Sequence, residues 1–174
     1  MSKSYPDALA LSRRVLRVLV KLNVLMGLAI LALLIASLVA PDFTMEALGV
    51  RPTAGNSALP VGMRLIMVVG ILAVPVTHIV LTRLLSIVET VRLGNPFVTE
   101  NAERLQTIAW AVLVLELMHL AVGAIAAAAS SEAQPLDLDW NFSVTRWLAV
   151  LLLFVLARVF DQGARMREEL EGTV

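Results

Sequence analysis

The chain has 174 residues, of which 59% are hydrophobic and 16% are charged, with a mean hydropathy of +0.84 and no net formal charge. This composition is typical of an integral membrane protein, and the length leaves no room for a large soluble catalytic domain. The sequence contains no cysteine, which excludes disulfides, thiolate metal sites and cysteine nucleophiles. We therefore predict an all-α integral membrane bundle in which residues 1–174 form a single domain.

Four apolar segments are long enough to cross a bilayer as helices, which requires about 20 residues each. They cover residues 21–40, 64–83, 107–129 and 143–160, which predicts a bundle of four transmembrane helices. The second segment contains Pro75, which removes a backbone donor and predicts a kink. A hairpin at residues 84–106 and a tail at residues 161–174 complete the predicted domain.

The distribution of basic residues predicts the orientation of these spans. Eleven of the 14 Lys and Arg residues lie on the side of the two termini and the hairpin. The positive-inside rule then places both termini and the loop around Pro96 in the cytoplasm, with Thr53 and Gln134 outside.

The third segment carries ionisable side chains within the predicted membrane. Helical spacing predicts an inward face made of Ala109, Val112, Glu116, His119, Gly123 and Ala126. A carboxylate in the bilayer costs about 3 kcal/mol, so Glu116 needs a partner or a proton, and Arg64 and Arg146 are the expected ion-pair partners. The cluster of Glu116, His119, Arg64 and Arg146 is either a polar cavity for a small ligand, ion or proton, or a structural group that fixes helix register.

We expect no cofactor, no metal and no enzymatic activity. Glu116-x-x-His119 has the spacing of helical di-metal carboxylate sites, but the chain has no second copy of this pair. His78 and His119 differ in predicted depth by about 12 Å, so they cannot ligate one haem. The sequence also lacks a nucleophile elbow, a phosphate loop and paired carboxylates.

The first segment carries two stripes at helical spacing. A packing seam is predicted at Asn23, Gly27, Ile30, Leu34 and Ser37. A basic stripe precedes it at Arg13, Arg17 and Lys21. The basic stripe suits anionic lipid headgroups, and because no base-reading motif accompanies it, we expect no direct binding of nucleic acid.

The hairpin has the local signals of two helix ends. Gly94 suits the left-handed residue that follows a helix, and Asn95-Pro96 predicts a turn. Thr99 and Glu100 then suit the start of a new helix, where acidic side chains are favoured.

Two stretches together resemble a known family: LGNPFVTENAERLQTIAW in the hairpin (Leu93–Trp110) and LARVFDQGARMREELEGTV in the tail (Leu156–Val174). The family is a group of bacterial four-span membrane proteins catalogued as domain of unknown function 2975. The matching hairpin positions are Gly94, Pro96, Phe97, Asn101, Arg104 and Leu105. The matching tail positions are Ala157, Val159, Phe160, Gly163, Glu168, Glu169, Leu170, Glu171, Thr173 and Val174. The resemblance implies four spans in a bacterial cytoplasmic membrane and no assigned activity.

Members of this family often lie beside a small Cro-type helix-turn-helix regulator, which implies a membrane partner that tethers or controls a transcription factor. The predicted docking residues are Asn95, Pro96, Phe97, Asn101, Arg104, Arg165, Glu168, Glu169 and Glu171. Our first hypothesis is therefore a regulatory or sensory protein with the hairpin and tail as its output surface, although the tail could instead be a solvated extension. The alternative is a homo-oligomeric protein that handles a small solute or an ion through the cluster around Glu116.

Overall fold

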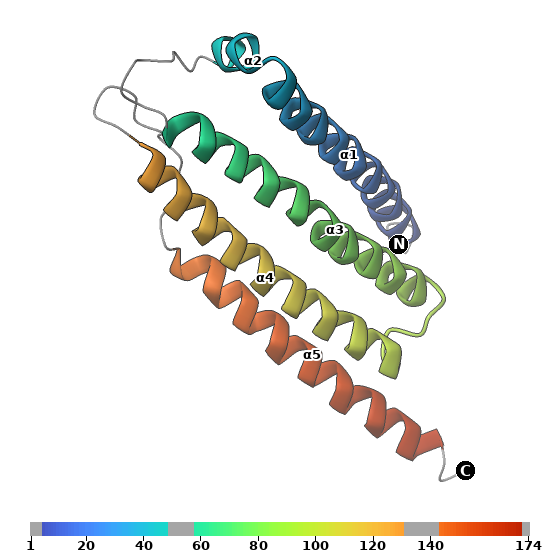
Figure 1. The fold of residues 1–174 in the computed structure, drawn as a ribbon. Helices are drawn as coiled ribbons and strands as arrows, with labels where there is room; N and C mark the ends of the chain where they lie inside the picture. The colour runs from blue at the N-terminus through green and yellow to red at the C-terminus, as the bar shows by residue number, and fades with distance from the viewer. Residues whose placement is uncertain (1–4, 49–57, 131–142, 172–174) are drawn as a thin grey trace. The chain divides into compact units, whose positions relative to one another are not determined.

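The computed structural model describes residues 5–48, 58–130 and 143–171, and these residues form five helices without any strand. The helices are α1 (Tyr5–Val39), α2 (Pro41–Ala47), α3 (Ala58–Arg92), α4 (Thr99–Ala129) and α5 (Val144–Glu171), shown in Figure 1. The prediction of an all-α fold is confirmed.

The long helices extend well beyond the predicted spans. Both α1 and α3 have 35 residues, α4 has 31 and α5 has 28. Hydropathy marks only the apolar part of each helix, whereas the Leu-, Ala- and Arg-rich flanks are also good helix formers and continue it. The hairpin and the tail are therefore mostly helical, and only residues 93–98 connect α3 to α4.

Three helices are long and apolar enough to cross a membrane: α1 from Leu9 to Val39, α3 and α4. Many of their large apolar side chains face outward, as expected for helices that contact lipid. The fourth predicted span falls in α5, which is not among these three. Its uninterrupted apolar run, Trp147–Ala157, is only about 16 Å long at 1.5 Å per residue. A crossing by α5 would therefore need Arg146 and Arg158 to reach the headgroups with their long side chains.

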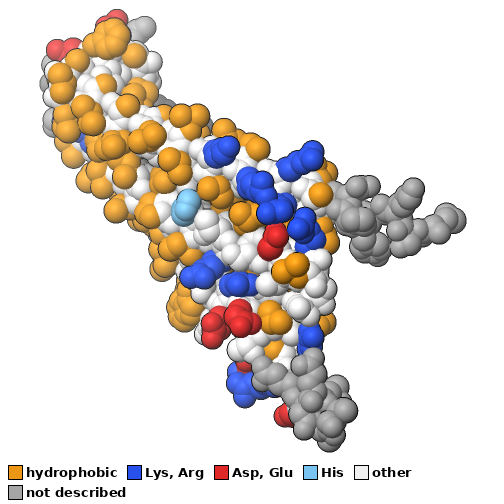
Figure 2. All heavy atoms as spheres, turned by 90° about the vertical axis from the view of Figure 1, so that its right-hand side faces the viewer, with side chains coloured by type: hydrophobic (Ala, Val, Ile, Leu, Met, Phe, Trp, Pro, Cys, Tyr) orange, Lys and Arg blue, Asp and Glu red, His pale blue; other side chains and the backbone are white. Residues whose placement is uncertain are grey.

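The chain divides into two compact units, which we describe separately. The first unit contains Met1–Asn23, Val76–Val114 and Ser143–Val174, and the second contains Val24–Pro75 and Leu115–Phe142. The division passes through α1, α3 and α4, and in α3 it falls directly after Pro75. Among the described Lys and Arg residues, only Arg64 belongs to the second unit. Figure 2 shows blue Lys and Arg side chains that gather on the face it displays.

Small residues let the helices of the second unit approach closely. Gly27 lies against Val74, where an added Cβ would come within 2.9 Å of Cγ1. At Gly62 an added Cβ would overlap with the Cβ of Ala129. The predicted packing seam of α1 therefore does face α3, and α3 meets α4 at equally short range.

In the second unit, an arginine caps a free carbonyl group in the last turn of α1. The carbonyl of Ser37 lacks its usual amide partner four residues later, because Pro41 has no N–H. The Nη2 of Arg64 donates a hydrogen bond to this carbonyl at 2.6 Å. The Ser37 side chain is fully buried beneath it and donates to the carbonyl of Leu34 at 2.8 Å.

In the first unit, α3 ends in the cap that the sequence predicts. Gly94 has a φ of +83°. The amide of Asn95 donates to the carbonyl of Thr90 at 3.0 Å, and the amide of Gly94 donates to that of Val91 at 3.1 Å. These two bonds form a Schellman motif, which satisfies the last carbonyls of α3 and turns the chain toward α4. The predicted helix start at Thr99 is also confirmed.

Candidate functional site

The second unit holds three of the four residues in the predicted polar cluster. Arg64 on α3 and Glu116 and His119 on α4 are all half-buried. The guanidinium of Arg64 donates a hydrogen bond from Nη2 to the carbonyl of Ser37. Arg146, the fourth residue, belongs to the first unit and is half-buried near the start of α5.

Two polar atoms of this cluster are buried without a hydrogen bond. Within the described ranges, the Nε of Arg64 and the Nε2 of His119 have no partner. On α4, Ala109 and Ala126 of the predicted inward face are 0% and 1% exposed. The described residues contain no cluster of three or more His, Asp or Glu side chains that could hold a metal ion.

A hydrogen-bonded network holds the hairpin of the first unit. Asn101 is 0% exposed, and its Nδ2 donates to the carbonyl of Pro96 at 2.9 Å and to Oγ1 of Thr90 at 2.8 Å. Its Oδ1 accepts a hydrogen bond from Nη1 of Arg104 at 2.8 Å. We predicted Asn101 as a docking residue, but a fully buried amide cannot contact a partner. It instead fixes the loop between α3 and α4, because buried polar groups need internal partners.

The loop and the tail are brought together by packing and by a polar contact. The rings of Phe97 and Phe160 lie 5.3 Å apart between centroids, with an interplanar angle of 39°. Gly163 lies under the Phe97 ring, where an added Cβ would be 3.1 Å from Cδ1. The Nη2 of Arg167 donates to Oδ1 of Asn95 at 3.3 Å. Asn95 and Phe97 of the hairpin therefore share one surface with Phe160, Gly163 and Arg167 of the tail.

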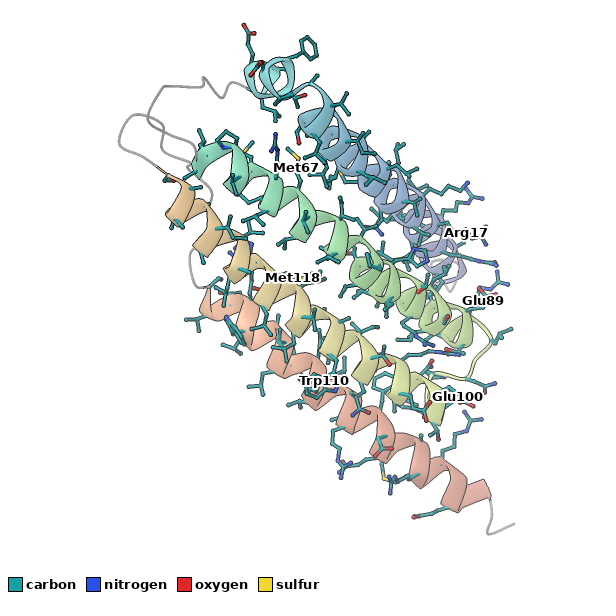
Figure 3. The ribbon with its side chains drawn as sticks, viewed as in Figure 1. Arg17, Met67, Glu89, Glu100, Trp110 and Met118 are labelled. Atoms are coloured by element: carbon teal, nitrogen blue, oxygen red, sulfur yellow. The ribbon has the colours of Figure 1, made fainter. Side chains whose placement is uncertain are left out.

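This surface contains a hollow, which we call the hairpin groove, with a volume of about 290 Å³. It is lined by Asn95, Phe97, Val98, Thr99, Glu100, Ala164 and Arg167. Figure 3 shows Glu100 at the start of α4, and its side chain is exposed. The groove thus combines one exposed aromatic ring, Phe97, with charged groups of both signs.

The family model described as "Protein of unknown function (DUF2975)" matches residues 35–174. The chain belongs to this family. The match includes the hairpin and the tail of this DUF2975 member, and it carries no assigned activity. Neither a curated protein nor a solved structure matches the chain.

The remaining predicted docking residues of the DUF2975 member differ in exposure. Arg165 and Glu169 are exposed, and Pro96 and Arg104 are half-buried. The side chains of Glu168 and Glu171 lie outside the described residues, as do Thr53 and Gln134.

Our reading of the sequence missed a charged group on α5. The side chains of Arg158 and Arg165 both contact Asp161, three and four residues away. This spacing places charges on one face of a helix and could have revealed the group.

Proposed function

We propose that this DUF2975 protein is a regulatory or sensory membrane protein whose hairpin and tail dock a small soluble helix-turn-helix regulator, which it tethers or controls. The observation that carries the proposal is the contact of Phe97 with Phe160 and Gly163, which joins two distant stretches into one surface. The hairpin groove in this surface presents an aromatic ring beside charged groups, a combination that is common at protein interfaces.

The proposed topology has four spans, with α5 as the last, and both termini and the hairpin in the cytoplasm of a bacterial cell. It is supported by the concentration of described Lys and Arg residues in the first unit, which also contains the hairpin. In this arrangement the docking surface faces the compartment in which a DNA-binding regulator resides.

Cysteine labelling tests this topology directly, because the natural chain has no cysteine. Leu93 in the hairpin loop and Glu46 in α2 are both exposed, so each can be changed to cysteine without entering a packed core. In intact cells a membrane-impermeant maleimide should label Glu46→Cys but not Leu93→Cys. Labelling of Leu93→Cys alone would invert the proposed orientation.

Docking is tested with the purified protein in lipid nanodiscs and a small Cro-type helix-turn-helix regulator. We expect binding in interferometry, and we expect Glu100→Lys to weaken it severalfold because Glu100 lines the hairpin groove. The matched control is Glu46→Lys, the same change at an exposed position of the second unit. Absence of binding by the wild type, or equal effects of the two substitutions, would refute the docking surface.

A second candidate function is favoured by the unpartnered buried atoms of Arg64 and His119. Because such atoms are costly in an apolar setting, they suit a homo-oligomeric protein that binds a small solute or an ion there. In proteoliposomes this function predicts flux that Glu116→Gln and His119→Gln abolish without lowering the unfolding temperature. If the protein mediates flux and does not bind the regulator, the solute- or ion-handling function replaces the regulatory one.

A further inference from the structure

A second hollow in the first unit, which we call the interfacial groove, lies between the first turns of α4 and the middle of α5. Its volume is about 570 Å³, roughly twice that of the hairpin groove. Glu103 and Gln106 line it from α4, and Arg158, Asp161 and Arg165 line it from α5. None of these residues was expected to form a site, except Arg165 as a docking residue.

The two ends of this groove differ in polarity. At one end it is lined by Phe154 and Ala157 of α5. The ring of Phe154 meets the ring of Trp110 edge-on, with centroids 5.1 Å apart and an interplanar angle of 83°. Trp110 is 55% exposed on α4, one of the three membrane-spanning candidates, and lies beside α5 in Figure 3. Exposed tryptophans on membrane helices favour the headgroup level, so we place the groove at this level.

The α5 wall carries a net positive charge. The Nη1 of Arg158 and the Nη2 of Arg165 each lie 3.3 Å from the same oxygen, Oδ2 of Asp161. One carboxylate therefore serves two guanidinium groups, whose side chains remain 72% and 69% exposed. Each guanidinium has five N–H donors, so most of them are left for a further anion. The N-terminus of α4 at Thr99, which also lines the groove, adds a partial positive charge.

The α4 wall presents the opposite charge. Glu103 is exposed and lines the same groove, and it forms no ion pair with any described residue. A ligand that satisfies both walls must therefore carry an anion and, within the same small group, a cation that can donate hydrogen bonds.

We propose that the interfacial groove binds the headgroup of phosphatidylethanolamine. Its phosphate contacts Arg158 and Arg165, its primary ammonium contacts Glu103, and its acyl chains follow the exposed apolar surface of α5 at Leu151 and Val155. Phosphatidylglycerol has the phosphate but no cation, and the trimethylammonium of phosphatidylcholine has no N–H to donate. The proposal goes beyond the docking of a regulator and does not depend on it.

Fluorescence quenching can detect this lipid, because Trp110 is in contact with a residue that lines the groove. Replacing Trp140 and Trp147 with phenylalanine leaves Trp110 as the only tryptophan of the chain. This variant is reconstituted into phosphatidylcholine vesicles that contain a minor fraction of ethanolamine, glycerol or choline phospholipid with brominated acyl chains. We expect the ethanolamine lipid to quench Trp110 at about threefold lower content than the other two, the size expected for a partly exposed ion pair.

Charge variants show which wall recognises which group. Glu103→Gln should abolish the preference for ethanolamine over choline lipid and leave quenching by the glycerol lipid unchanged. The double change Arg158→Gln with Arg165→Gln should weaken quenching by both the ethanolamine and the glycerol lipid. Glu100→Gln is the matched control, since Glu100 is an exposed carboxylate of the same helix end that does not line this groove.

Several outcomes would overturn the proposal. Equal quenching by the three brominated lipids would mean that the groove selects no headgroup. Retention of the ethanolamine preference in Glu103→Gln would remove the ammonium contact. Unfolding temperatures are measured for every variant, so that a loss of fold is recognised, and the single change Arg158→Gln replaces the double change if the latter does not fold. Failure of regulator binding leaves these results unaffected, because no regulator is present in the vesicles.

Discussion

The hairpin of the first unit and the helix contacts of the second unit are held together by different forces. In the hairpin, the side chain of Asn101 is hydrogen-bonded to three residues, a Schellman motif ends α3, and an aromatic pair joins the loop to α5. In the second unit, Gly27 and Gly62 let helices pack at short range, and a hydrogen bond from Arg64 to Ser37 joins α3 to α1.

This difference follows from the surroundings of each region. Where helices are surrounded by lipid, apolar side chains gain nothing from leaving the solvent, so close packing of small residues supplies the attraction. Where a chain must turn, free backbone groups need partners, and specific side chains provide them. Substitutions should therefore act through steric overlap in the second unit and through lost hydrogen bonds in the hairpin.

The largest effect is expected at Gly62. Gly62→Ala forces a methyl group into Ala129 and should lower the free energy of unfolding by about 2–3 kcal/mol. Gly70→Ala is the matched control, because its Cβ would lie at an ordinary 3.5 Å from Ile30 Cδ1. The control should be neutral or stabilising, since alanine favours the helix. The free energies of unfolding of both variants are measured in detergent by circular dichroism. Equal losses for Gly62→Ala and Gly70→Ala would show that close packing at Gly62 is not the main force that holds these helices together.

The second-largest loss of stability is expected for substitution of Asn101. Asn101→Leu leaves the Pro96 carbonyl and the Arg104 guanidinium without their partner and should cost about 2 kcal/mol. Asn95→Ala, which removes an exposed contact of 3.3 Å, should cost less than about 0.5 kcal/mol in the same assay. If Asn101→Leu lowers the free energy of unfolding no more than Asn95→Ala does, the hydrogen bonds of Asn101 do not stabilise the hairpin.

A double-mutant cycle examines the polar contact of the second unit. Pro41→Ala provides an N–H four residues after Ser37, which can bond to its carbonyl if α1 extends through Ala40, so Arg64→Met should be better tolerated in that background than in the wild type. We expect a coupling free energy of about 1 kcal/mol from unfolding of the two single variants and the double variant. Strict additivity would show that Arg64 does not replace the missing amide.

A loss of stability of similar size is expected for substitution of Gly94. An added Cβ has nothing within 4 Å, so Gly94→Ala should cost only the strain of a φ of +83°, about 1 kcal/mol. Gly94→Asn should cost less, because asparagine tolerates this conformation better. Equal losses for the two variants would argue against backbone strain as the cause.

The smallest effect is expected at the ion pair between α1 and α3. Arg13 Nε lies 3.3 Å from Oε2 of Glu89, and about a third of each side chain is exposed. Glu89→Gln should change the free energy of unfolding by less than about 0.5 kcal/mol, and this change should vanish at high salt. If Glu89→Gln instead lowers the free energy of unfolding as much as Asn101→Leu does, directional polar contacts stabilise the first unit outside the hairpin as well.

The local sequence determined a good part of this architecture. The apolar content and the long apolar segments identify a helical membrane protein, since the bilayer tolerates few other structures. Gly94, Thr99 and the seam through Gly27 were also predictable, because caps and helix faces depend on residues only a few positions apart. The helix ends were not, because hydropathy does not distinguish a polar helical turn from a loop.

The tertiary structure alone decided which polar residues meet. Arg64 donates to a carbonyl of Ser37 on another helix, and Asn101 is buried rather than exposed. The interfacial groove likewise combines Glu103 of α4 with Arg158 of α5. The periodicity of the sequence shows which face of a helix is polar, but it does not show which residues of other helices contact that face. Those contacts depend on how helices distant in the sequence pack against one another.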